Sequence, residues 1–115
     1  MDEDAARELI AAARATVSER IAALTADVAG LVAASRDANA DDEHDPEGST
    51  IAFERAQVLA LLDRARAELA ELDAADERLA AGTFGRCVHC GGAIGDERLA
   101  ARPAASTCVA CAARR

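Results

Sequence analysis

Four cysteines near the end of the chain constrain its fold more than any other feature of the sequence. They form two pairs, Cys87 with Cys90 and Cys108 with Cys111, in the spacing C-x2-C-x17-C-x2-C. Each pair can direct two thiolates at one metal ion from a tight turn, and two pairs complete the tetrahedral shell of a structural zinc site. The sequence therefore predicts one structural Zn²⁺ bound by these four residues and a small finger, residues 82–115, that folds around it.

Three other interpretations of the cysteines fit the sequence less well. Disulfides need an oxidising compartment, but the acidic start Met1–Asp4 lacks the positive segment of an export signal. A redox C-x2-C motif needs a βαβ context, and a catalytic zinc keeps an open ligand position. His89, inside the first pair, is interpreted as a surface residue. The glycines Gly91 and Gly92 can turn backbone N–H groups toward the sulfur atoms.

Residues of about 3–38 have the apolar spacing of a coiled-coil helix. The steps between successive apolar residues are 4, 3, 4 and 3, and Ala13 and Ile10 extend the series toward the N-terminus. The predicted seam positions of this helix are Val17, Ile21, Leu24, Val28 and Leu31.

A second apolar series predicts a second helix that ends at Gly82. Its predicted seam positions are Ile51, Val58, Leu62, Ala65, Leu69, Leu72 and Leu79, with Asp76 at one seam position. Between the two series the chain is acidic and without period. Pro46 and Gly48 break the helix there, and Ser49 or Thr50 is the expected N-cap.

These patterns predict an all-α dominated fold, in which a long antiparallel helical hairpin (coiled coil) precedes a small C4 zinc finger. The hairpin would occupy residues 1–81, with an acidic tip at 41–48, and the finger would occupy residues 82–115. Two helices of a parallel dimer or a larger bundle are the alternative, because a two-helix hairpin alone buries little area.

Charge and hydropathy argue against several classes of function. Residues 1–81 have a net charge of −11 and residues 82–115 a net charge of +3. An acidic body opposes direct DNA binding, since phosphates would repel it. The absence of a long uncharged apolar run predicts no membrane span, and a cytoplasmic location is expected. Without a nucleophile–base pair, a phosphate loop or an open metal site, the sequence predicts no enzyme.

An antiparallel hairpin with an acidic tip, followed directly by a C4 zinc finger, resembles the DksA/TraR family of bacterial transcription regulators over about residues 4–115. The resemblance rests on the segment Gly82–Gly91, which contains the family pattern FGxCxxCG, on Ala101-Arg102-Pro103, and on the 17-residue spacing between the cysteine pairs. It implies a regulator that binds RNA polymerase rather than DNA and inserts its hairpin into the secondary channel. Two aspartates in an Asp-x-x-Asp-x-Ala pattern would then act near the catalytic centre. The matching residues here are Asp42 and Asp45, with Glu47 in place of the alanine.

The resemblance also raises the question of ppGpp binding. Some family members bind this alarmone together with polymerase, through basic residues. Arg102 matches one such position, but Glu71 replaces a lysine and Ala112 replaces a basic residue. These two departures argue against alarmone binding. A protein–protein interaction scaffold that does not act on transcription is the alternative function. The two functions differ at the tip, because a scaffold would tolerate loss of its acids.

Overall fold

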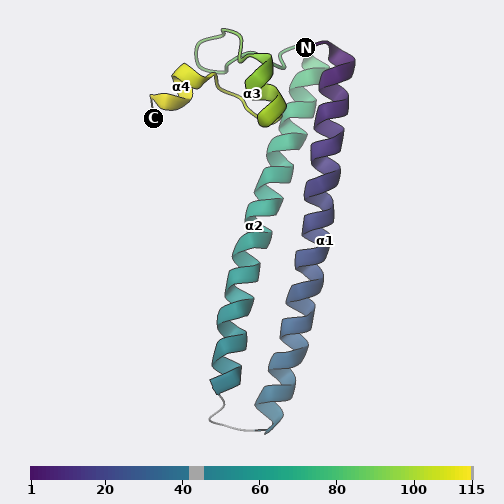
Figure 1. Cartoon of the computed structure of the whole chain (residues 1–115), viewed down its shortest axis with the longest axis vertical. Coiled ribbons are helices and arrows are strands. Elements are labelled where there is room, and N and C mark those ends of the chain that lie inside the picture. The colour runs from purple at the N-terminus through teal and green to yellow at the C-terminus, as the bar shows by residue number, and fades with distance from the viewer. Residues whose placement is uncertain (42–45, 115) are drawn as a thin grey trace. The chain divides into compact units, whose positions relative to one another are not determined.

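Two long helices make up most of the chain. In the computed structural model, which describes residues 1–41 and 46–114, helix α1 spans Glu3–Asp41 and helix α2 spans Pro46–Ala81 (Figure 1). Two short helices follow, α3 at Asp96–Ala101 and α4 at Val109–Ala113. Within the described ranges there is no strand, only an isolated antiparallel bridge between Arg86 and Ala93. The predicted all-α hairpin followed by a C4 cysteine cluster is confirmed.

The chain divides into two compact units. The finger unit contains Met1–Thr16 and Glu68–Arg115, and the hairpin unit contains Val17–Ala67. In each unit a segment of α1 lies antiparallel beside a segment of α2 (Figure 1). The functional division into residues 1–81 and 82–115 stays a prediction. None of the helices in the described ranges is long and apolar enough to cross a membrane.

Buried residues in both units follow the predicted helix seams. In the hairpin unit Val17, Leu62 and Ala65 are 2%, 4% and 1% exposed. Ile10 and Leu72 are equally buried in the finger unit. The small alanines at the seam permit a close approach of the two helices. The apolar spacing read from the sequence therefore identifies the contact face of each helix.

The predicted seam position Asp76 is wrong, because Ala75 takes its place. Ala75 is fully buried, at 0% exposure, whereas Asp76 is exposed. Positions 75 and 76 each lie one helical turn after Leu72 and one turn before Leu79, so the i, i+3, i+4 pattern allows either residue at this contact. With Ala75 at the contact, the Asp76 carboxylate stays out of the apolar interface, where its desolvation would be costly.

The helix boundaries at the predicted tip also differ from expectation. Helix α1 continues to Asp41, and α2 begins at Pro46 rather than after Ser49 or Thr50. Proline is well accommodated in the first turn of a helix, since its missing N–H would have no partner there and its φ is already helical. Pro46 therefore starts α2 instead of separating it from the acidic segment.

Candidate metal centre and the adjoining pocket

The four cysteine sulfur atoms converge on one point in the finger unit. Every Sγ of Cys87, Cys90, Cys108 and Cys111 lies within 4.8 Å of the other three. The Sγ atoms of Cys90 and Cys108 are 3.8 Å apart. A tetrahedral zinc site with Zn–S bonds of about 2.3 Å has sulfur–sulfur edges of about 3.8 Å. The donor set therefore fits one structural Zn²⁺, as the sequence predicts.

The first cysteine pair is held by a tight turn that the glycines complete. The N–H of Gly91 donates to the carbonyl oxygen of Cys87 at 2.9 Å, and Gly91 has a positive φ of 74°. The N–H of Gly92 donates to the Sγ of Cys90 at 3.4 Å. A donor to a thiolate stabilises its negative charge and orients it toward a metal. The predicted support of the sulfur atoms by the glycine backbone is confirmed for Gly92.

The second pair begins helix α4. Cys108 is the N-cap residue of α4, and its Sγ accepts a hydrogen bond from the N–H of Cys111 at 3.5 Å. The Cys108 carbonyl accepts from the N–H of Ala112 at 2.9 Å. A turn of helix with a cap therefore brings the two thiols of this pair to the same side.

A small apolar cluster joins the two pairs. Cys87, Ile94, Leu99 and Ala105 are buried together, and Phe84 packs against them. Val88 and Val109, which each follow the first cysteine of a pair, are 61% and 63% exposed. So small a core explains why a metal is needed, since the ligands themselves supply much of the buried contact.

Hydrogen bonding shifts the pKa values of the Cys87 and Cys111 thiols in opposite directions. The backbone N–H groups of Cys90, first, and of Cys108 lower the pKa of the Cys87 thiol to about 6. Hydrogen bonds to the sulfur atoms of Cys108, first, and of Cys87 raise the pKa of the Cys111 thiol to about 12. The thiolate is the form that binds metal. The lowered pKa of Cys87 therefore favours its metal-binding thiolate form.

The remaining sequence-predicted residues fall outside this cluster. His89 is exposed and does not belong to the ligand group, as expected. Asp42 and Asp45 lie outside the described residues, so their predicted role at the tip stays a prediction. Glu47 belongs to the first turn of α2, although its side chain lies outside what the structure describes.

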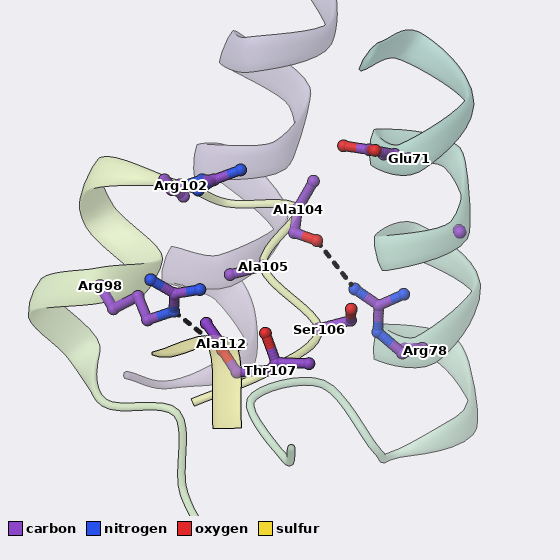
Figure 2. Close-up of a pocket in the computed structure, with 10 residues that line it drawn as sticks. Glu71, Arg78, Arg98, Arg102, Ala104, Ala105, Ser106, Thr107 and Ala112 are labelled. Atoms are coloured by element: carbon purple, nitrogen blue, oxygen red, sulfur yellow. Dashed lines mark hydrogen bonds between the residues drawn. The ribbon is translucent and has the colours of Figure 1, made fainter. Parts of the chain in front are cut away.

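A pocket of about 490 Å³ lies beside the metal centre within the finger unit, and Figure 2 shows its lining. Its charged groups are three arginines, Arg78 from α2, Arg98 from α3 and Arg102, which follows α3, together with Glu71 from α2. Uncharged residues complete it: Ala74, Ala104, Ala105, Ser106, Thr107 and Ala112. Positive charge therefore dominates the pocket, with one carboxylate inside it.

Two of these arginines bind the backbone of the segment between α3 and the second cysteine pair. The Nε of Arg98 donates to the Thr107 carbonyl at 2.8 Å, and the guanidinium of Arg78 donates to the Ala104 carbonyl at 3.4 Å (Figure 2). The resemblance placed Arg102, Glu71 and Ala112 in one functional group, and the structure brings these three together. It did not identify Arg78 as a neighbour. No sequence signal marks that contact, because it joins two elements 26 residues apart.

Comparisons with known proteins agree with this site. Residues 82–115 match the family model of the prokaryotic dksA/traR C4-type zinc finger. A solved structure, the transcription factor DksA2 from Pseudomonas aeruginosa, is similar with a TM-score of 0.58 and 29% sequence identity. The similarity covers 93% of this chain and 82% of that chain. No curated protein matches the chain.

The family match covers the four cysteines and the turn that holds them, and the similar structure covers nearly all of the chain. Residues 82–115 therefore match the C4-type zinc finger of the DksA/TraR family, in a chain with a DksA-like fold.

Proposed function

We propose that the chain is a bacterial transcription regulator that binds RNA polymerase through the secondary channel and acts with the acidic segment between α1 and α2. The observation that carries the proposal is the combination, in one chain, of a DksA/TraR-type finger with a helical hairpin similar to that of a transcription factor, DksA2. Neither part alone would carry it, because zinc fingers and helical hairpins each serve many functions.

The acidic segment between α1 and α2 is the part of the chain that we propose acts on transcription. Helix α1 ends at Asp41 and α2 begins at Pro46, so Asp42 and Asp45 belong to the four residues that join them. Glu47 follows within α2. Carboxylates at the end of a narrow helical hairpin suit a pore with basic walls that leads to a catalytic Mg²⁺ ion. The proposed role of these acids is electrostatic, so each should act through its charge.

The proposal does not include ppGpp as a ligand. Glu71 places a carboxylate in the pocket that also contains Arg102, and Ala112 adds no positive charge there. In Figure 2 the side chains of Glu71 and Arg102 enter the pocket from different sides. Of the other two arginines, Arg78 and Arg98 already donate to backbone carbonyls. A polyphosphate would meet both a repulsive carboxylate and arginines with part of their donor capacity in use.

Removal of the tip charge tests the proposal. The double variant Asp42→Asn with Asp45→Asn should retain its fold and zinc content but lose, or reverse, the effect of the wild-type chain on transcription by purified RNA polymerase. Binding to polymerase should decrease only modestly if the rest of the chain provides most of the contact area. A triple variant that adds Glu47→Ala shows how much of the charge Glu47 replaces.

The matched control is the double variant Asp27→Asn with Asp63→Asn. Both residues are exposed acids of the hairpin unit, outside the acidic segment, so this control removes the same charge from α1 and α2. It should act on transcription like the wild type. If the wild-type chain and the tip variants all bind polymerase and have the same effect on transcription, the acids of this segment have no role in transcription. The interaction scaffold then becomes the better interpretation.

A further inference from the structure

The segment that leads into the second cysteine pair is held from two sides. On one side, the N–H of Val88, from the first pair, donates to the Ser106 carbonyl at 2.9 Å. On the other side, the Nε of Arg98 donates to the Thr107 carbonyl at 2.8 Å (Figure 2). Consecutive carbonyl groups are therefore fixed by different elements, immediately before the metal ligand Cys108.

The Thr107 carbonyl has a direct geometric link to Cys108. This carbonyl and the Cys108 N–H belong to one planar peptide group, so a hydrogen bond to the oxygen fixes the orientation of the whole plane. The orientation of that plane sets where the Cys108 side chain begins. Thr107 is only 6% exposed, so water has little access to replace the arginine as donor.

Arg98 is itself well anchored. Its neighbour Leu99 is 3% exposed in the apolar cluster that contains the ligand Cys87, and this contact fixes α3 on the finger. The planar guanidinium presents its N–H groups in fixed directions, so little conformational freedom is lost when one of them binds a carbonyl. Arg98 thus connects the cluster beside the first pair to the backbone of the second pair.

We propose that Arg98 is a positioning residue of the zinc centre. Arg98 fixes the peptide group before Cys108, so that the second cysteine pair is already oriented to bind the metal. Arg98 does not touch the metal ligands' sulfur atoms in this role. It acts through the Thr107 carbonyl, and loss of its hydrogen bond should let Cys108 leave the shell more easily. Changes in such outer groups typically reduce metal affinity about 10-fold to 100-fold.

The experiment compares zinc release from the purified, zinc-loaded wild-type chain and from Arg98→Ala, with an excess of a chromophoric chelator. Arg98→Ala should release zinc about 10-fold faster or more. Replacement of zinc by Co²⁺ gives a second readout, because the visible absorption bands of the thiolate complex report ligand geometry. These bands should shift in Arg98→Ala, which a simple loss of stability in α3 would not cause.

The matched control is Arg102→Ala, which removes the same charge from the same pocket. Its side chain forms no hydrogen bond with the described part of the chain. This variant should release zinc at nearly the wild-type rate, with unchanged cobalt bands. Arg98→Lys, which keeps the charge and a donor on a flexible stem, should release zinc at an intermediate rate.

Three outcomes decide the proposal. If Arg98→Ala is purified without zinc while Arg102→Ala remains zinc-loaded, the predicted weakening of zinc binding is complete and the proposal is supported. Equal release rates for Arg98→Ala and Arg102→Ala would overturn the proposal, since positive charge alone would then explain the change. Unchanged cobalt bands in Arg98→Ala would overturn it as well.

Discussion

Cys87→Ser should abolish zinc binding and unfold the finger while α1 and α2 keep most of their helical content. Cys87 is both a ligand and a buried member of the small apolar cluster, so its loss opens the metal shell and weakens the core together. The helices depend instead on their own seam, which includes Val17 and Leu62. Elemental analysis should find a decrease from about one zinc per chain to almost none.

Two further measurements separate the finger from the helices in this variant. Far-UV circular dichroism should change little, whereas trypsin should cut rapidly after Arg86 and Arg98, which are protected only if the finger is folded. His89→Ala is the matched control, because His89 lies inside the first pair but is exposed and is not among the ligands. It should keep its zinc. A Cys87→Ser chain with full zinc content, or with a finger that resists trypsin, would contradict the four-cysteine site.

Leu62→Asp should destabilise the hairpin by about 3 to 5 kcal/mol. Leu62 is 4% exposed in the hairpin unit. The described part of that unit consists of segments of α1 and α2, so its burial comes from packing between the two helices. The substitution removes an apolar side chain and places a carboxylate in the same contact. Urea unfolding followed by circular dichroism measures the change in the free energy of unfolding.

Leu61→Asp provides a control at the next position of the same helix. Leu61 is 48% exposed, so the same change of side chain should alter the free energy of unfolding by only about 0.5 kcal/mol. The difference between the two variants isolates burial from helix propensity, because both introduce Asp into the same turns of α2. Similar unfolding curves for the two variants would show that Leu62 does not face α1.

The cluster of four cysteines could be predicted from the sequence because the chemistry of each pair is local. Each C-x2-C pair forms its own turn, and a closed tetrahedral site requires the two pairs to meet. The seam positions could be predicted for the same reason, since each helix repeats its apolar residues at its own period. These predictions depend on residues close together in the chain, as the buried Leu62 and the converging cysteines illustrate.

Features that the local pattern leaves open, or that depend on long-range geometry, could not be predicted. Ala75 rather than Asp76 takes the seam position, and the spacing alone does not decide between them, because both residues lie one helical turn from Leu72 and from Leu79. The start of α2 at Pro46 depends on a choice between two helix-start signals only a few residues apart. The contacts of Arg78 and Arg98 require the folded finger, because each carbonyl acceptor belongs to an irregular segment.

Equilibrium binding to purified bacterial RNA polymerase tests the central claim most directly. The zinc-loaded wild-type chain should sediment with the polymerase core enzyme in saturable fashion, as one chain per polymerase, and should not sediment with duplex DNA alone. The tip variant Asp42→Asn with Asp45→Asn should still bind, since its acids serve the effect on transcription rather than most of the contact area. Absence of saturable binding by the folded, zinc-loaded chain would contradict the account and favour an interaction scaffold that does not act on transcription.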